Sequence, residues 1–370
     1  MEVFRLYGFD KPLFYTTLFL ITLGLVMVTS ASGVFALKNY NQQFYFSFQQ
    51  FIGAAVGLAL IILLLPIRRP YYKSPVFVFG LLGLTFVLLV LCFAMPAVAN
   101  TNRWIVFHGM RFQPSELAKI SLILFLAWYL DRKREKIREP RALVIPLGVI
   151  LLFTFLILRE PDFGTAVLVL FLGLIMLYLG GVRFKYFLYL GAGLIPILAF
   201  YLFSAQYRID RLTAFLSPEA NINTLNFQVN QSKLAIGSGG LFGVSFGESV
   251  QKLFFLPCSH TDFIFAIIGE EFGLLGALIT LALFAALVWR GLTISMKAPD
   301  LFSQWAAAGL TLFLGIQALL NMTVVLGLGP AKGVPLPLVS FGRSSLVCDL
   351  LAIGLLLHIS QRKGDGRGAA

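Results

Sequence analysis

The chain has 370 residues, of which 58% are hydrophobic and only 12% are charged. This composition excludes a soluble globular fold for most of the chain, because too few polar side chains remain to cover a water-exposed surface. The formal net charge is +12. Lys and Arg gather in short segments between long apolar runs, as in DRKREKIREPR at 131–141, so we expect them to contact anionic membrane lipids and no nucleic acid.

Ten apolar runs follow one another along the sequence. Each has about 17 to 25 residues, which as an α-helix is enough to cross roughly 30 Å of hydrocarbon. The sequence therefore predicts an all-α polytopic membrane protein, with a single transmembrane domain over residues 1–370. We predict the spans at residues 13–33, 46–67, 75–96, 114–131, 142–158, 164–181, 186–204, 263–289, 304–327 and 344–360.

The distribution of positive charge indicates the orientation. An even number of spans places both termini on one side of the membrane, and Lys and Arg accumulate in cytoplasmic loops. With the N-terminus inside, 18 of the 29 Lys and Arg residues fall in cytoplasmic segments. We therefore expect cytoplasmic N- and C-termini, localisation to the cytoplasmic (inner) membrane, and a long outer loop at about 205–262 between the seventh and eighth spans.

Two outer segments carry most of the unusual polar residues. They are TNRWIVFHGMRFQPSELAK at 101–119 and the long loop at about 205–262. Loops longer than about 15 residues in a compact protein are usually functional or disordered, and this one alternates apolar and polar residues too regularly for disorder. We expect short helices on or in the outer leaflet. The glycine run GSGGLFG at 237–243 lacks the ending of a nucleotide-binding loop and is predicted to form a turn.

The stretch QPSELAK has the local chemistry of a helix start. Pro114 suits the first helical turn, and Glu116 suits the positive end of the helix. Lys119 lies three residues after Glu116, so the two side chains share a face and can form an ion pair. Just upstream lie an aromatic residue and two basic ones, Trp104, Arg103 and Arg111. These are either anchors at the membrane surface or a cationic collar for a phosphate-bearing ligand.

Asp262 ends a polar cluster that directly precedes an apolar span. Thr261 could cap a helix that starts near Asp262, whose carboxylate would then meet the positive helix end. Glu270 and Glu271 follow about 12 Å further along the same helix. Carboxylates at that depth cost about 2.5 kcal/mol or more unless they are paired or hydrated. They indicate a polar interior, which is either a buried salt bridge or a cavity lined by Glu270 together with Asp262.

Five stretches together resemble the SEDS family, which contains the FtsW, RodA and SpoVE proteins of bacterial division, shape and sporulation. They are RWIxFxxxRFQPSELAK at 103–119, PDFGT at 161–165, QSKLAIGSGGLFG at 231–243, LPxxHTDFIFAIIGEEFG at 256–273 and KGVPLPLVSFGxSS at 332–345. The motifs are long and occur in order over essentially the whole chain. The runs FGVSFGESVQKLFFLP at 242–257 and GPAKG at 329–333 are more similar to FtsW or SpoVE than to RodA.

This resemblance implies a peptidoglycan glycosyltransferase that polymerises lipid II at the outer face of the cytoplasmic membrane during cell division. It releases undecaprenyl diphosphate and works with a class B penicillin-binding protein. The reaction needs a base for the acceptor hydroxyl and cations for the leaving diphosphate. The resemblance makes Asp262 the essential loop carboxylate and therefore the expected base. Candidate substrate-binding residues are Arg103, Trp104, Arg111, Glu116, Lys119, Arg208, Arg211, Ser232, Lys233, His260, Thr261 and Glu270.

Two opposing effects act on Asp262. A helix N-terminus lowers the pKa of a carboxylate, whereas desolvation raises it, and a base that works near neutral pH needs the second effect. No tightly bound cofactor is expected. The family's activity implies a divalent cation, Mg or Mn, which could bridge the diphosphate and the carboxylate, although the sequence contains no dedicated metal cage.

The sequence departs from the family pattern at several positions. Cys258 replaces the glutamate after LP, Glu160 replaces the glutamine of QPDxGT, and Arg343 replaces a glycine of SxGGSS. Asp349 lies unusually within the last span, where it could pair with Arg343 despite a poor helical spacing. The departures at Cys258 and Arg343 favour a non-catalytic divisome scaffold as one alternative. A RodA-like elongation polymerase and a lipid II flippase are the other two alternatives.

Overall fold

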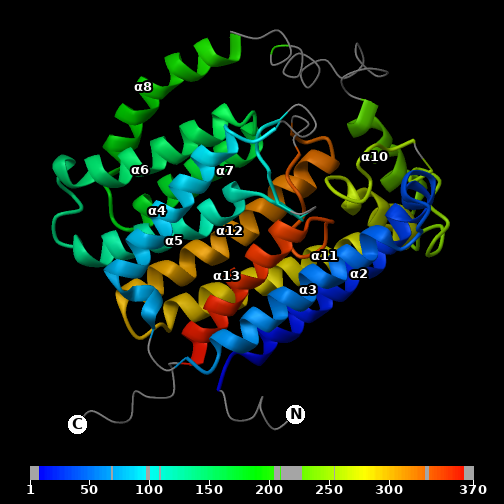
Figure 1. The fold of residues 1–370 in the computed structure, drawn as a ribbon, viewed down its shortest axis with the longest axis horizontal. Helices are drawn as coiled ribbons and strands as arrows, with labels where there is room; N and C mark the ends of the chain where they lie inside the picture. The colour runs from blue at the N-terminus through cyan, green and yellow to red at the C-terminus, as the bar shows by residue number, and fades with distance from the viewer. Residues whose placement is uncertain are drawn as a thin grey trace.

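The protein is a bundle of long helices (Figure 1). The computed structural model describes residues 8–67, 70–96, 101–107, 110–203, 209, 227–253, 255–329 and 333–361. In chain order its elements are α2 (Lys11–Tyr40), α3 (Tyr45–Leu64), the 3-10 helix η1 (Tyr71–Lys73), α4 (Pro75–Cys92), β1 (Ile105–Phe107), β2 (Met110–Phe112), α5 (Pro114–Arg132), α6 (Pro140–Arg159), α7 (Phe163–Leu179), α8 (Phe184–Phe203), α10 (Phe227–Ser238), α11 (Ile264–Met296), α12 (Leu301–Val325) and α13 (Arg343–Gln361).

Each of the ten predicted spans coincides with one long helix, α2 to α8 and α11 to α13. Seven of them, α2, α3, α4, α6, α11, α12 and α13, are long and apolar enough to cross a membrane. Helix α7 is a shorter apolar helix of 17 residues. Helix α5 carries Glu116 and Lys119 near its start and Arg132 at its end, which lowers its hydropathy. The predicted all-α polytopic architecture is confirmed.

The start of α2 and the end of α13 lie at the same end of the bundle. The backbone N–H of Asp10 donates to Ser360 Oγ at 3.0 Å. The Asp10 carboxylate also pairs with Arg290 of α11 at 2.5 Å, and Lys73 of η1 pairs with Asp300, the N-cap of α12. An even number of crossings requires the two chain ends to share one side.

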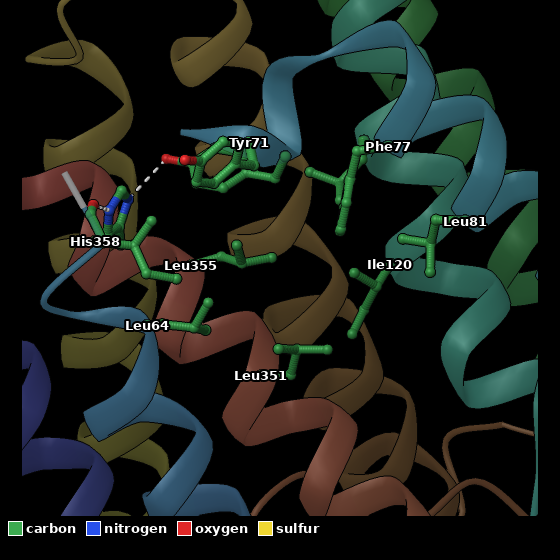
Figure 2. Close-up of a pocket in the computed structure, with 11 residues that line it drawn as sticks. Leu64, Tyr71, Phe77, Leu81, Ile120, Leu351, Leu355 and His358 are labelled. Carbon is green, nitrogen blue, oxygen red and sulfur yellow. Dashed lines mark hydrogen bonds between the residues drawn. The ribbon is translucent and has the colours of Figure 1, made fainter. Parts of the chain in front are cut away.

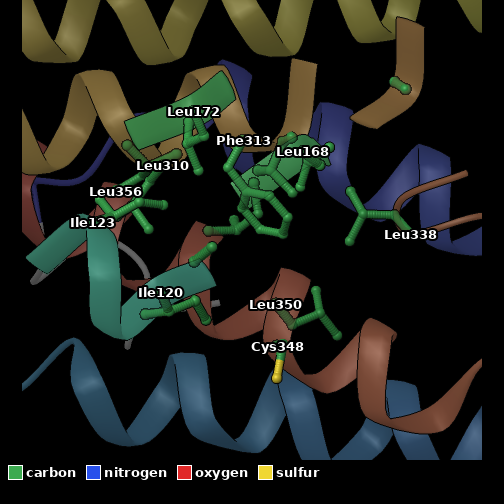
Figure 3. Packing of buried hydrophobic residues seen from close by; sticks show 14 of the residues in the cluster. Ile120, Ile123, Leu168, Leu172, Leu310, Phe313, Leu338, Cys348, Leu350 and Leu356 are labelled. Atoms are coloured by element: carbon green, nitrogen blue, oxygen red, sulfur yellow. The ribbon is translucent and has the colours of Figure 1, made fainter. Parts of the chain in front are cut away.

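Helices α5, α12 and α13 form the centre of the bundle and bury most of their residues. Figure 3 shows Phe313 of α12 close to Leu168 of α7, within the same cluster as Ile123 of α5. The backbones approach closely at Gly309, where a Cβ would lie 2.7 Å from Ile123 and from Met176. Lipid tails are as apolar as these side chains, so close van der Waals packing drives the association of the spans.

An apolar cavity of about 160 Å³ lies between α3, α4, α5 and α13. Figure 2 shows Phe77 on the opposite side of this cavity from His358. His358 Nδ1 accepts a hydrogen bond from the Tyr72 hydroxyl at 2.9 Å, and its Nε2 donates to Ile67 O at 2.6 Å. Both ring nitrogens of His358 are therefore bonded, and most of the other residues that line the cavity are apolar.

The outer loop is attached to a break in α11. Gly273 has a φ of +66° within this helix, which interrupts its backbone hydrogen bonds. The N–H of Leu274 donates instead to Gly240 O at 2.9 Å, and the N–H of Val244 donates to Glu270 O at 3.0 Å. The loop therefore supplies hydrogen-bond partners to backbone groups of α11 that have none within the helix at the break. Buried backbone N–H and C=O groups need such partners.

Local structure in the outer segments only partly matches the sequence predictions. The glycine run at 237–243 ends α10 and forms a turn, and α10 is a short helix, as expected. The predicted cap on α11 is wrong, because α11 begins at Ile264 and has no side-chain cap. Residues 258–263 form a turn instead, in which Thr261 Oγ1 donates to Cys258 O at 3.2 Å. The antiparallel pair β1–β2 was not predicted.

Gly243→Ala is expected to destabilise the outer loop. A Cβ at this position would lie 2.1 Å from Glu271 O, and Gly243 has a φ of +84° that L side chains rarely adopt. Strain of this kind costs about 1 to 3 kcal/mol per residue. Thermal unfolding in detergent should therefore give a lower Tm than for the unmodified protein.

Gly237→Ala is the matched control. A Cβ on Gly237 meets nothing within 4 Å, and alanine is better than glycine within a helix by about 0.5 to 1 kcal/mol. Its Tm should be unchanged or slightly higher. Equal Tm values for the two variants would contradict the role assigned to Gly243.

Candidate functional site

Asp262 lies in the turn directly before α11 and is half-buried. A Cβ on Gly333 would lie 2.9 Å from Asp262 Oδ2, so only a glycine leaves room for the carboxylate there. The backbone of Asp262 is fixed by Asn321 of α12, whose Nδ2 donates to Asp262 O at 2.7 Å and to Val334 O at 2.8 Å. Within the described residues the carboxylate itself forms no hydrogen bond, so it is available to a ligand.

The residues before Asp262 are held by the segment 333–342. Ser340 Oγ donates to Thr261 O at 2.5 Å, and the N–H of Phe341 donates to His260 O at 3.0 Å. The His260 ring packs against Phe46 of α3, with ring centroids 4.7 Å apart. Burial lowers the pKa of His260 to about 4, so its imidazole is neutral at physiological pH. His260 and Thr261 therefore position Asp262 through backbone contacts.

Asp162, in the PDFGT motif, is buried near the same point. It caps α7, because its Oδ1 accepts from the N–H of Thr165 at 3.1 Å and its Oδ2 accepts from Thr165 Oγ1 at 2.9 Å. Gln113 Nε2 donates to Oδ2 at 3.2 Å. Asp162 thus has donors within the protein, and its negative charge acts on its neighbours.

Arg103 is the cation of this cluster. Its Nη1 lies 3.8 Å from Asp162 Oδ2, and its guanidinium lies 5.8 Å from the ring centroid of Trp104. About a third of the Arg103 side chain is exposed, at 31%. Its charge acts on the ionisation of Asp262, Glu160 and Cys258. The charge of this one guanidinium therefore lowers the pKa of three neighbouring acidic groups.

Desolvation dominates the ionisation of Asp262. Burial raises the pKa of Asp262 to about 6, and this effect exceeds the lowering by Arg103, while Asp162 raises the pKa further. The opposition between desolvation and the helix N-terminus is resolved, because α11 starts only at Ile264. A carboxylate with this pKa is ionised at neutral pH and binds a proton more readily than an ordinary aspartate, which suits a general base.

Glu116 and Lys119 form the predicted ion pair inside the bundle. Lys119 Nζ lies 2.8 Å from Glu116 Oε2, and it donates to Gln317 Oε1 of α12, also at 2.8 Å. Gln317 Nε2 in turn donates to Pro335 O at 3.1 Å. Both charged side chains are buried. The pair connects α5, α12 and the segment 333–342, so its observed contacts are structural.

Glu270 and Glu271 bind groups of the outer loop and do not contact Asp262. Glu270 accepts from Ser249 Oγ at 2.5 Å and from the N–H of Val250 at 3.0 Å. Glu271 pairs with buried Lys252 at 2.8 Å. The buried salt bridge is therefore confirmed for Glu271, whereas Glu270 is held by hydrogen bonds from the outer loop. These contacts do not form the alternative cavity shared by Glu270 and Asp262.

The remaining candidates are dispersed. Ser232 Oγ bonds to Val325 O at 2.7 Å and is buried. The exposed Lys233 side chain packs against Gly327, after the end of α12. The side chain of Arg111 is exposed, while its carbonyl accepts from Ser344 Oγ at 3.0 Å. Arg208 and Arg211 lie outside the described residues.

The comparisons with known proteins identify the chain. The sequence profile of the FtsW, RodA and SpoVE group, described as cell cycle protein, matches residues 11–364. The chain belongs to the FtsW/RodA/SpoVE family. A relative in Geobacter sp., named "Probable peptidoglycan glycosyltransferase FtsW", is 38% identical over 99% of this chain and 100% of its own length. Stage V sporulation protein E of Bacillus subtilis is 38% identical over 95% of this chain and 97% of its own length.

Solved structures of the family share the fold. The rod shape determining protein RodA of Thermus thermophilus has a TM-score of 0.71 at 26% identity and covers 96% of this chain and 98% of its own. A chain of a peptidoglycan synthase complex has a TM-score of 0.79 at 24% identity, over 97% of this chain and 99% of its own. This member of the family is therefore a multi-pass inner-membrane protein.

Sequence reasoning missed several residues of the cluster. Asp162 and Gly333 lie within the family motifs PDFGT and KGVPLPLVSFG, but their positions in the sequence did not indicate a function for either residue. Asn321 lies in an apolar span, where a buried amide is itself a signal, because amide groups at that depth need partners. The suggested pairing of Arg343 with Asp349 is wrong, since Asp349 Oδ2 accepts from the N–H of Leu338 at 3.2 Å.

Lys119→Met should strongly destabilise the protein, because it leaves the Glu116 charge buried without its cation. Breaking one partner of a buried pair costs about 3 to 5 kcal/mol. The double variant Glu116→Gln with Lys119→Met should recover much of this loss, since it buries no charge. Unfolding of the single and double variants in detergent measures the coupling, and additive losses would contradict the pairing.

Proposed function

We propose that this chain is a peptidoglycan glycosyltransferase of the FtsW type, which polymerises lipid II at the outer face of the inner membrane during cell division. The names of the full-length FtsW relatives support the activity. The observation that carries the proposal is Asp262, a carboxylate with a pKa of about 6 and no hydrogen-bond partner among the described residues, close to the guanidinium of Arg103.

In the proposed reaction Asp262 acts as the general base. It accepts the proton of the acceptor sugar's 4-hydroxyl while that oxygen attacks the anomeric carbon of the donor. The new glycosidic bond forms as the bond from the anomeric carbon to the diphosphate oxygen breaks, and undecaprenyl diphosphate leaves with the electron pair. Arg103 stabilises the negative charge that develops on this leaving group, which is where a positioned cation lowers the barrier.

A divalent cation, Mg²⁺ or Mn²⁺, fits this site in one way. The described residues contain no group of three acidic, His or Cys side chains that could hold a metal ion by themselves. As an alternative to acting as the free base, Asp262 would hold the ion together with the substrate, since Mg²⁺ is commonly held by one or two carboxylates and phosphates. When bound, the ion would help Arg103 to neutralise the diphosphate.

A transpeptidase partner is part of the proposal. The structural neighbour at TM-score 0.79 comes from a complex that coordinates polymerization and crosslinking. We infer a class B penicillin-binding protein as the crosslinking partner of this chain. Polymerisation should therefore be assayed with the two proteins purified together.

Asp262→Asn tests the catalytic assignment. It keeps the shape of the side chain but removes the base, and general-base catalysis contributes about 10²- to 10⁴-fold to rate. With lipid II as substrate, the variant should form glycan strands at least about 100-fold more slowly. Glu248→Gln, at an exposed outer position, is the matched control and should retain full activity. Full polymerisation by Asp262→Asn would refute the base, and translocation of lipid II without polymerisation would favour a flippase.

The pH dependence of polymerisation gives a separate prediction. A general base must be ionised, so kcat/KM should rise with pH through the pKa of Asp262, at about 6. Below this pH the carboxyl is protonated and the rate should fall about tenfold per pH unit. The rate profile between pH 4.5 and 7.5 tests this, and an acid limb centred near the ordinary aspartate value of about 3.9 would contradict the desolvation of Asp262.

A further inference from the structure

Glu160 is a buried acid that the proposed mechanism does not use. It follows the last residue of α6 and is fully buried. Both carboxylate oxygens lack a hydrogen-bond partner in the described part of the chain. An isolated buried carboxylate anion is strongly unfavourable, so such a group normally takes up a proton.

Arg103 acts on the ionisation of Glu160 through its positive charge. Its Nε is buried and unpaired within the described residues. Its Nη1 lies 3.8 Å from Asp162 Oδ2, which is beyond hydrogen-bonding distance. Arg103 therefore has donors that can turn toward either Asp162, the substrate or Glu160.

We propose that Glu160 is a positioning residue that controls where the Arg103 guanidinium points. When Glu160 is a neutral acid, it does not attract Arg103, which then interacts with Asp162 and with the diphosphate of the substrate. As a carboxylate, it attracts the guanidinium and withdraws it from the leaving group. This role rests on the proposed glycosyltransferase function, in which Arg103 stabilises that group.

The surroundings of Glu160 favour the neutral form at physiological pH. Burial raises the pKa of Glu160 to about 8, the negative charge of Asp162 raises it further, and Arg103 lowers it. Cys92 of α4 is the other titratable group within electrostatic range. Between about pH 6 and pH 8 Glu160 therefore leaves Arg103 to the other acids of the cluster, and above pH 8 its own negative charge competes for the same cation.

Glu160→Gln separates these states, because an amide has the shape of the neutral acid and cannot ionise. In the unmodified protein, polymerisation should decline above pH 8 as Glu160 loses its proton, by about tenfold at pH 9. The variant should match the unmodified protein at pH 7 and keep its activity at pH 9, with the difference appearing in kcat, because Arg103 acts on the charge that develops on the leaving group. Superimposable alkaline limbs in the two proteins would overturn the proposal.

Glu248→Gln is the control for charge removal. It removes a carboxylate from an exposed outer position, so its pH profile should follow that of the unmodified protein. If this control lost the alkaline limb as well, the limb would report overall charge and the proposal would fail.

A second measurement does not depend on activity. Infrared spectra of the unmodified protein minus Glu160→Gln should contain the C=O band of a buried carboxylic acid, which titrates away near pH 8. In an Arg103→Met background the midpoint should rise by about one pH unit, because the cation no longer favours the anion. An unchanged midpoint would refute the electrostatic interaction with Arg103, whereas a shifted midpoint without polymerisation would refute only the glycosyltransferase.

Discussion

The buried backbone of residues 333–342 is the constraint on which the site depends. Non-helical backbone inside a membrane bundle is tolerated only where other protein groups satisfy its amides and carbonyls. Gln50 Nε2 donates to Ser340 O at 3.0 Å, Gln317 donates to Pro335 O, and Asp349 accepts from Leu338 N. The same segment fixes the turn that carries Asp262, since Ser340 and Phe341 bond to its backbone. Polar residues within the spans therefore hold the segment that fixes the Asp262 turn.

The outer cluster has more acids than cations, and this imbalance determines its chemistry. Asp162 is bonded to Thr165 and Gln113, so its carboxylate is held in place. Burial raises the pKa of Asp262 and Glu160, and Arg103 opposes this rise in both. A cationic metal or the positive edge of a partner would change the same balance, because one guanidinium controls several ionisations at close range. An anionic substrate that binds Arg103 would therefore change the ionisation of these acids.

The helices were predictable because the membrane imposes a length and a composition on each span, and these are visible in apolar runs. The pair Glu116 and Lys119 was predictable too, since a spacing of three residues places both on one helix face. Predictions from helical spacing were wrong where the chain is not helical. Thr261 does not cap α11, because residues 258–263 turn before the helix begins. Glu270 bonds to a loop that approaches from another part of the chain.

The sequence by itself determined the all-α membrane architecture, since hydropathy is a local property. Charge bias and long motifs, which are also local, predicted the side of the membrane for each loop and the importance of Asp262. Only the tertiary structure decided which residues meet Asp262. Arg103, Asp162 and Gly333 come from three distant segments, and their proximity depends on how α5, α7, α12 and α13 pack. Desolvation is likewise a property of packed neighbours, so the elevated pKa of Asp262 and Glu160 exists only in the folded bundle.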